Sequence, residues 1–309
     1  METKHDVIVN NKRGVQFKFT VYRKFTIIRG DSATGKTTLF QMVSDAASSR
    51  MSGVTVSCDV PVRPLNESGY LRELQEESGR IYVIDEDFGP LKSMEFAKAA
   101  TISDNCFLII TRESLSAIPY SYKEIYGIKA SGKFHSLERI FPDYETLRDA
   151  DAIVTEDEDS GYEYYKTYFG SKVSSSKGNS NLSKYGSDNT LLIGDGCAIG
   201  AYIQDLLLTG ADLYLPESFE YTLLQKDMFS RVAEVQQSIR YPEEMIGTGY
   251  ASPERYYTVL LSQITQNTPA RYSKTSLNEC YVKDCCCKGT RCEFFTREKK
   301  LPEIPGKIQ

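Results

Sequence analysis

The stretch IIRGDSATGKTTLF, residues 27–40, decides the fold of the first half of the chain. It begins in an apolar run and then matches the pattern G-x-x-x-x-G-K-[ST] at Gly30, Gly35, Lys36 and Thr37. Beyond the pattern, apolar residues recur at helical spacing. The stretch therefore predicts a strand, a glycine-rich loop and a helix, in that order.

The loop in this stretch predicts a phosphate site. Its glycines allow backbone N–H groups to turn inward at a helix N-terminus and cradle phosphate oxygens. Lys36 would reach the β- and γ-phosphates of ATP, and the Thr37 hydroxyl would be a ligand of Mg²⁺. The residues expected to contact the nucleotide are Gly30, Asp31, Ser32, Ala33, Thr34, Gly35, Lys36, Thr37 and Thr38.

A second apolar strand is predicted at residues 81–84, and it runs directly into Asp85, Glu86 and Asp87. Four apolar residues followed by Asp-Glu resemble the Walker B motif of P-loop NTPases. The resemblance implies that Asp85 lies near the Mg²⁺ and that Glu86 polarises the attacking water. ATP hydrolysis would then depend on Glu86 together with Lys36. The alternative is a buried strand that ends in acids without a catalytic role.

Two more apolar runs, at residues 54–60 and 106–113, are rich in β-branched residues and fit the same parallel sheet. The second contains Thr111 and Arg112, where P-loop proteins often place a polar sensor of the γ-phosphate; a solvated strand end is the alternative. Residues 14–30 resemble the antiparallel strands that lead into the P-loop of ABC-like and SMC-like ATPases. The chain has no LSGGQ-like signature, so an ABC-type dimer is not supported.

In the second half of the chain, predicted strands alternate with predicted helices, with a loop expected at residues 171–182 and a helix whose helical spacing is set by the aromatic residues Tyr162, Tyr165 and Phe169. Acidic residues follow three of the predicted strands, at Glu156, Asp195 and Glu220. The carboxyl ends of parallel strands meet at one edge of a sheet, so these carboxylates are expected to converge if the strands are neighbours. Clustered carboxylates suit Mg²⁺ or Mn²⁺, and such a site can activate water toward a phosphodiester. A solvated strand-end face is the alternative.

The order of these features resembles a Toprim domain, the metal-dependent fold of topoisomerases, primases and the OLD-family nucleases. The resemblance covers about residues 150–235 and rests on Glu156, on a loop with Gly178, Ser180 and Asn181, on Asp195 and on the segment with Glu220. OLD-family nucleases also join an ATPase to a Toprim domain, in the same order as here.

Two departures from the Toprim pattern leave the role of this half open. Toprim domains usually carry Asp-x-Asp where this chain has Asp195, Gly196 and Cys197, and Asp157 stands where a glycine normally follows the first acid. One alternative is a divergent metal site in which Glu156, Asp195 and Glu220 are catalytic. Another is a degenerate scaffold that binds a partner, and a third is an unrelated α/β domain.

Five of the eight cysteines lie between residues 280 and 292. Four thiolates suit a tetrahedral Zn²⁺ ion, although the usual pairs of C-x₂-C are missing. The preferred ligand set is Cys280, Cys286, Cys287 and Cys292, with Cys285 as the alternative to Cys286. Redox-active thiols and inert surface cysteines remain the competing interpretations.

The composition of the chain indicates its general class and its location. The chain has 309 residues, 40% of them hydrophobic and 26% charged, and a net charge of −5. It contains no run of eighteen apolar residues, and its N-terminus lacks the apolar core of a signal peptide, so a cytoplasmic protein without membrane contact is expected. The acidic balance permits nucleic-acid binding without indicating it.

The predicted architecture is an α/β protein of two domains. A P-loop NTPase domain is expected at residues 1–145, a Toprim-like domain at 150–275 and a Cys-rich segment at 276–309. Two functions compete: an ATP-dependent nucleic-acid enzyme, and a regulatory or assembly ATPase whose nucleotide state controls how the second domain grips a protein partner. A small-molecule kinase is a weaker third, because no arginine-rich lid is evident. A homo-oligomer is expected, because P-loop domains often complete their sites across subunits.

Overall fold

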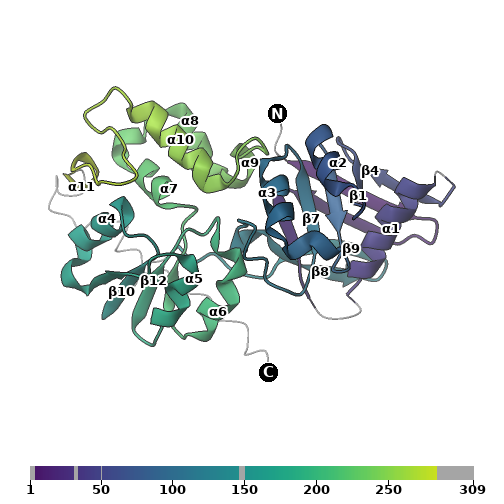
Figure 1. The fold of residues 1–309 in the computed structure, drawn as a ribbon, viewed down its shortest axis with the longest axis horizontal. Coiled ribbons are helices and arrows are strands. Elements are labelled where there is room, and N and C mark those ends of the chain that lie inside the picture. The colour runs from purple at the N-terminus through teal and green to yellow at the C-terminus, as the bar shows by residue number, and fades with distance from the viewer. Residues whose placement is uncertain (1–3, 31–33, 50, 146–149, 284–309) are drawn as a thin grey trace. The chain divides into compact units, whose positions relative to one another are not determined.

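The computed structural model describes residues 4–30, 34–49, 51–145 and 150–283, which form a mixed α/β protein (Figure 1). The chain divides into two compact units. The first unit consists of residues up to 141 together with 240–256, and the second of residues 142–239 and the part that follows Tyr256.

Residues 240–256 return to the first unit, which differs from the sequence prediction that placed them in the second domain. Polar contacts fix this returning segment. The Thr248 hydroxyl donates a hydrogen bond to the carboxylate of Asp104, and Glu244 pairs with Lys4 at 3.6 Å. Such contacts between residues far apart in sequence leave no local pattern that a sequence interpretation could use.

A nine-stranded sheet forms the first unit, in the order β4-β1-β2-β9-β8-β3-β7-β6-β5. Its strands are β1 (His5–Asn11), β2 (Gln16–Val21), β3 (Phe25–Ile28), β4 (Val54–Ser57), β5 (Val62–Pro64), β6 (Ile81–Ile84), β7 (Cys106–Ile110), β8 (Ile125–Ser131) and β9 (Phe134–Arg139). The strands from β8 to β5 pair in parallel, whereas β1 pairs antiparallel with both β2 and β4. Every residue of β3, β6 and β7 is buried, which explains why their sequences are almost wholly apolar, with Thr26 in β3 as a polar exception.

The structure confirms the predicted strands β3, β6 and β7 and the antiparallel strands before the loop, but the prediction for residues 54–60 is wrong. That run forms β4, which pairs antiparallel with β1 at the end of the sheet instead of joining the parallel part. The burial of β4 alternates between half-buried valines and exposed Thr55 and Ser57. Alternation of this kind is typical of a strand with one face in water.

Helix α1 (Lys36–Ser48) fills the concave side of this sheet. It buries Leu39, Met42 and Val43, which lie on one helical face, in a core shared with β1 and β2. The helix contacts β4 and β1 near one end of the strand order and β5 and β6 at the other, so the sheet curls around it. The remaining α-helices of this unit are α2 (Tyr70–Glu76), α3 (Met94–Ile102) and α9 (Pro242–Met245).

A four-stranded, wholly parallel sheet forms the second unit, in the order β11-β10-β12-β13. The strands are β10 (Ala152–Thr155), β11 (Val173–Ser175), β12 (Thr190–Ile193) and β13 (Asp212–Tyr214). The α-helices that follow along the chain are α4 (Ser160–Phe169), α5 (Asn179–Leu182), α6 (Ile203–Leu208), α7 (Phe219–Leu224), α8 (Ala233–Arg240), α10 (Pro253–Thr265) and α11 (Cys280–Lys283), and the first turn of α10 belongs to the first unit. The predicted alternation of strand and helix is therefore confirmed.

Two local predictions in the second unit need correction. Residues 171–182, predicted as a loop, contain the edge strand β11 and the short helix α5; a three-residue strand with one buried residue, Val173, has no recognisable period. Helix α4 forms as predicted, but it buries Tyr164 and Tyr165, and Tyr162 and Phe169 are only partly buried. Both buried rings pack against Phe219, with centroids 5.5 and 6.3 Å away.

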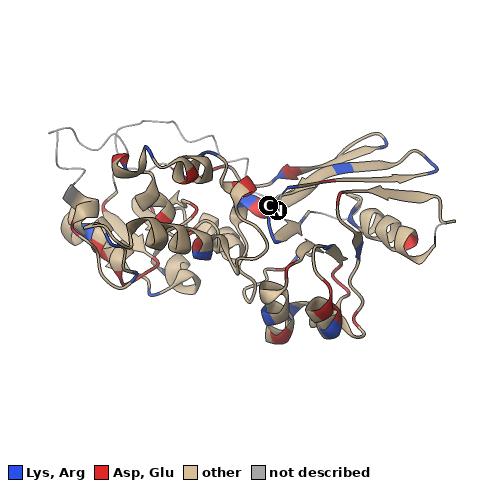
Figure 2. Ribbon diagram, turned by 90° about the horizontal axis from the view of Figure 1, so that it is seen from above, with Lys and Arg blue, Asp and Glu red and all other residues tan. Residues whose placement is uncertain are grey.

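Figure 2 shows acidic and basic residues mixed along the ribbon of each unit. This distribution agrees with the modest net charge of −5. Among the helices within the described ranges, none has both the length and the apolar character needed to cross a membrane.

Candidate functional site

Three adjacent parallel strands of the first unit end at one edge of the sheet. In the pairing of β3 with β7, Ile28 lies opposite Ile110, and in that of β6 with β7, Ile84 lies opposite Ile109. The residues just beyond these positions therefore emerge together. They are the glycine-rich loop after β3, Thr111 and Arg112 after β7, and Asp85 and Glu86 after β6.

A pocket of about 450 Å³ opens at this edge. It is lined by Thr34, Gly35, Lys36, Thr37, Thr38, Asp85, Glu86, Asp87, Ile110, Arg112, Ala130 and His135. The predicted phosphate-binding residues and the predicted acidic residues thus meet in one place, although they come from separate segments. Asp31, Ser32 and Ala33 lie outside the described residues.

Glycine backbone conformations shape the loop where it enters α1. Gly35, directly before the helix, has φ +98°, and Gly30 has φ +135°, and both values are rare for residues with a Cβ. The Lys36 ammonium donates to the Gly30 carbonyl at 2.6 Å and to the Thr34 hydroxyl at 3.3 Å. Lys36 is only 6% exposed, so its charge is held next to Gly30 and Thr34, the described residues on either side of 31–33.

The acidic side of the pocket offers oxygen ligands and a charged pair. An Asp85 carboxylate oxygen accepts a hydrogen bond from the Asp87 N–H at 3.2 Å. Burial raises the pKa of Asp85, as do the negative charges of Asp87 and Glu86, with the Asp87 N–H partly offsetting them. The Glu86 carboxylate lies 3.8 Å from the Arg112 guanidinium. The Thr37 hydroxyl and the Asp85 carboxylate are hard oxygen donors, the type that Mg²⁺ prefers.

Of the two polar residues that follow β7, only one lines the pocket, and the pocket also includes a histidine that the sequence did not predict, His135. Arg112, rather than Thr111, lines the pocket; Thr111 is buried, and its hydroxyl accepts from the Glu113 N–H at 3.1 Å. His135 comes from β9 and stacks on Phe17 with ring centroids 4.5 Å apart. The parallel pairing of β2 with β9 brings His135 to the loop, and a pairing between distant strands has no local sequence signal.

The second unit brings two of its predicted acids together at the carboxyl edge of its sheet. Glu156 follows β10, and its carboxylate accepts a hydrogen bond from the Asp195 N–H at 3.1 Å. Asp195 follows β12, and its carboxylate accepts from the Phe219 N–H at 2.9 Å. The predicted loop with Gly178, Ser180 and Asn181 reaches the same edge, because the Gly178 N–H donates to the Glu156 carbonyl at 2.6 Å.

Glu220 has a different environment from the other two acids. It lies in the first turn of α7, is 2% exposed, and accepts hydrogen bonds from the hydroxyls of Ser218, Thr258 and Tyr272 at 3.0, 3.0 and 2.6 Å. Burial and the charge of Glu220 raise the pKa of Tyr272, so that hydroxyl stays a donor. A Glu220 oxygen nevertheless lies within 4.8 Å of an Asp195 oxygen.

The two positions that depart from the Toprim pattern have structural contacts. The Asp157 carboxylate accepts from the N–H groups of Gly161 and Tyr162 at 3.2 and 2.7 Å, which caps the start of α4. Burial raises the pKa of this carboxyl. Cys197 is fully buried, and its N–H donates to the Glu217 carbonyl at 3.1 Å.

Of the four preferred zinc ligands near the C-terminus, the structure describes Cys280 alone. Its thiol lies 3.7 Å from the Pro269 carbonyl oxygen, at the start of α11. Cys286, Cys287 and Cys292 lie outside the described residues. No family model, no curated protein and no solved structure matches this chain.

Proposed function

We propose that the chain is a P-loop NTPase that binds ATP with Mg²⁺ in the pocket of the first unit and hydrolyses it. The observation that supports this most strongly is the shared pocket of Lys36, Thr37, Asp85 and Glu86. Lys36 and Thr37 open α1, whereas Asp85 and Glu86 follow β6, so only the folded sheet brings them together.

Each of these residues has a role that fits its surroundings. The buried Lys36 ammonium neutralises charge on the β- and γ-phosphates, and loop N–H groups add hydrogen bonds at the N-terminus of α1. Thr37 and Asp85 supply oxygen ligands to Mg²⁺. Glu86 orients the attacking water, and Arg112, 3.8 Å from Glu86, supplies positive charge near the transferred phosphoryl group.

Binding of a fluorescent ATP analogue in the presence of Mg²⁺ tests this proposal. Lys36→Ala should weaken binding by at least about tenfold, since a charge-assisted contact to phosphate is worth more than about 1.4 kcal/mol. Lys98→Ala is the matched control, because Lys98 is an exposed lysine on α3 of the same unit. Equal affinity of the wild type and Lys36→Ala would rule out this nucleotide site.

For the second unit, we propose a Toprim-like scaffold that binds a protein partner. The nucleotide bound to the first unit would control this binding. Three hydroxyl groups donate hydrogen bonds to the Glu220 carboxylate. Cys197, at the position of the second Asp in Asp-x-Asp, is buried. Both features favour binding over metal-dependent cleavage. Glu156 and Asp195 remain the ligands that a nuclease version of this site would use.

Incubation with plasmid and single-stranded DNA, with ATP and with Mg²⁺ or Mn²⁺, separates the two functions. The scaffold predicts intact DNA under every condition while ATP hydrolysis continues. Cleavage that is lost in Glu156→Ala and retained in Lys36→Ala would instead establish a nuclease. Glu158→Ala is the control for the Glu156 change, because Glu158 is an exposed acid that pairs with Lys177 at 3.0 Å.

A further inference from the structure

A second cavity lies at the opposite edge of the nine-stranded sheet. Its volume is about 610 Å³. Its walls include Lys24, Arg80 and Asn105, which immediately precede β3, β6 and β7. The nucleotide pocket lies at the other ends of these same strands, and within the described ranges the two cavities have no lining residue in common.

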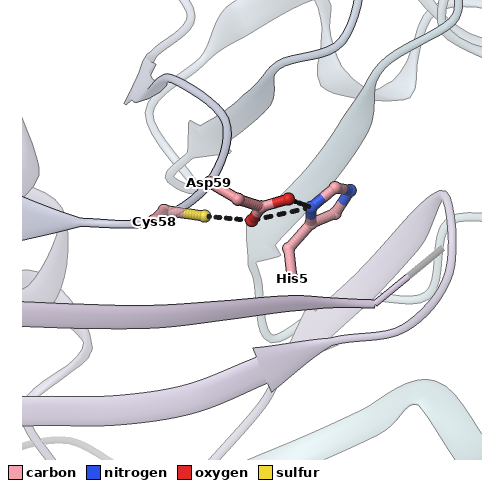
Figure 3. Close-up of side chains that lie close together, drawn as sticks. All are labelled: His5, Cys58 and Asp59. Carbon is pink, nitrogen blue, oxygen red and sulfur yellow. Dashed lines mark hydrogen bonds and ion pairs between the residues drawn. The ribbon is translucent and has the colours of Figure 1, made fainter. Parts of the chain in front are cut away.

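Three side chains carrying nitrogen, sulfur and oxygen donors meet beside this cavity (Figure 3). The Nδ1 atom of His5 lies 2.8 and 3.0 Å from the two carboxylate oxygens of Asp59, and the Cys58 thiol donates to one of them at 3.3 Å. One ligand atom from each of the three residues lies within 4.8 Å of the others. His5 and Asp59 also line the cavity itself.

The sheet explains why these residues converge. Strands β1 and β4 pair antiparallel, with Ile8 opposite Ser57, so the residues after β4 run back alongside the start of β1 and His5. The chain leaves β4 at Ser57 and bends at Asp59. Because Cys58 and Asp59 lie beyond the regular strand, their side chains need not point to opposite faces, as neighbours within a strand do.

We propose that His5 Nδ1, Cys58 Sγ and a carboxylate oxygen of Asp59 bind a Zn²⁺ ion, with water as the fourth ligand on the cavity side. Imidazole, thiolate and carboxylate are the three ligand types of zinc, and three protein ligands with one open position are typical of sites that also bind a small molecule. Bonds of about 2.0–2.3 Å in a tetrahedron set the donor atoms about 3.5 Å apart. In the structure, His5 Nδ1 and Cys58 Sγ lie 3.0 and 3.3 Å from the same Asp59 oxygen, so a small outward shift of the side chains makes room for the ion.

Protons must leave as the ion enters. The Cys58 thiol releases its proton to solvent and binds as thiolate, and the His5 proton that faces Asp59 moves from Nδ1 to Nε2. The Asp59 side chain is 51% exposed, so water can take up the thiol proton and can fill the fourth position. No group other than water is needed to balance the step.

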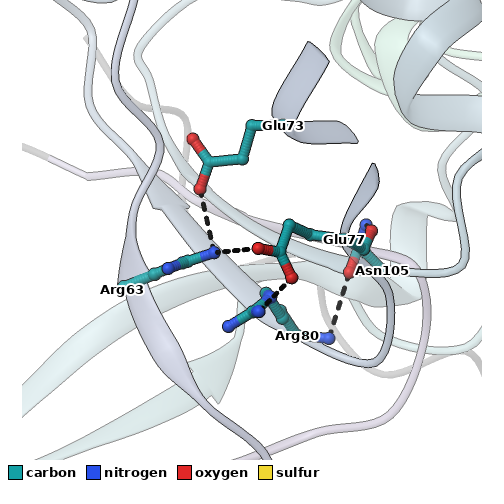
Figure 4. A network of polar contacts seen from close by, with 5 residues as sticks. All are labelled: Arg63, Glu73, Glu77, Arg80 and Asn105. Carbon is teal, nitrogen blue, oxygen red and sulfur yellow. Dashed lines mark hydrogen bonds and ion pairs between the residues drawn. The ribbon is translucent and has the colours of Figure 1, made fainter. Parts of the chain in front are cut away.

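The cavity beside the cluster has a rigid polar wall (Figure 4). The Arg80 N–H donates to the Asn105 side chain at 3.1 Å, and that side chain donates to the Glu77 carbonyl at 2.8 Å. The Arg80 guanidinium pairs with the Glu77 carboxylate, which also lies 3.8 Å from Arg63. Two residues of the cavity wall, Arg80 and Asn105, are therefore held in place by internal contacts.

The test measures Zn²⁺ and Co²⁺ binding, without nucleotide, to the full chain with the cysteines near the C-terminus replaced. In this background Cys280, Cys285, Cys286, Cys287 and Cys292 are serine, so that metal on that segment does not contribute. We expect one zinc ion per chain by elemental analysis after dialysis, and a thiolate-to-cobalt charge-transfer band with Co²⁺. Adding Cys58→Ser should abolish the band.

Further variants separate metal binding from mere polar packing. His5→Gln and Asp59→Asn should each weaken Zn²⁺ binding by at least about tenfold. Asp6→Asn should not, since Asp6 lies next to the cluster in β1 but bonds to Thr20 at 2.7 Å. Circular dichroism verifies that each variant is folded. No zinc in the folded background protein, or zinc binding unchanged by Cys58→Ser and His5→Gln, would overturn the proposal.

Discussion

Lys36 and Glu86 lie in the same pocket but in different surroundings, and this difference predicts separate roles for them. The Lys36 ammonium is buried and donates to the Gly30 carbonyl at 2.6 Å. Glu86 is about half exposed, with a side-chain exposure of 49%, and it pairs with Arg112 at 3.8 Å. A buried fixed charge suits ground-state binding, whereas a solvent-accessible carboxylate can hold a water molecule.

Glu86→Gln should therefore spare ATP binding and slow hydrolysis by about a hundredfold or more. The amide keeps the size of the side chain but cannot polarise water as a carboxylate does. Phosphate release and analogue binding are measured on the same preparation. Glu113→Gln is the control, because Glu113 is an exposed acid at the same edge that pairs with Lys92. Equal hydrolysis in the wild type and Glu86→Gln would show that another group positions the water.

Behind the acidic side of the pocket, an aromatic cluster joins two helices to the sheet. It consists of Tyr70 on α2, Phe88 in the loop after β6, Phe96 on α3 and Phe107 on β7. Edge-on contacts connect Tyr70 with Phe88 and Phe88 with Phe96 at 5.5 Å, and Phe96 with Phe107 at 6.0 Å. Phe88 follows Asp85 by three residues, so the cluster also holds the loop that carries the acids.

Phe96→Ala should lower the free energy of unfolding of the first unit by about 3–5 kcal/mol, because it opens a cavity at the centre of this cluster. Met94→Ala on the same helix should change it by no more than about 0.5 kcal/mol, since Met94 is 60% exposed. Urea unfolding followed by circular dichroism gives both values. Equal effects of the two changes would mean that α3 is not anchored through Phe96.

Buried parallel strands were the most predictable elements of the chain. β3, β6, β7 and β12 are buried throughout and mostly apolar because both faces are covered, and such a run is visible in the local sequence. Strand β4 has the same β-branched residues, but its place beside β1 depends on distant pairing, so its sheet position was predicted wrongly. For the same reason, the sequence did not predict that His135 lines the pocket or that His5 lies next to Cys58 and Asp59. Both proximities depend on strand pairing between distant segments.

The division into two units gives each unit its own sheet and core. The chain crosses between the units after residues 141, 239 and 256, so three covalent connections join them. Separate cores predict separate unfolding transitions, and a ligand that binds only the folded first unit should raise the stability of that unit. Any effect on the second unit then reports the control by nucleotide that we propose.

Calorimetry with and without ATP and Mg²⁺ should therefore show two transitions that respond differently. At a ligand concentration of about 100 Kd, binding adds about 2.7 kcal/mol, which raises the Tm of a unit of this size by roughly 5–10 °C. The Phe96→Ala variant assigns the transition of the first unit, because its cavity lies there. Lys36→Ala should lose the shift, and Glu86→Gln should keep it.

The second transition tests coupling between the units. A smaller ATP-dependent shift of this transition, present in Glu86→Gln and absent in Lys36→Ala, would support coupling. If the Tm of the second transition does not change with ATP in either variant, control of the second unit by nucleotide is contradicted. The proposal of an ATP site in the first unit would still stand.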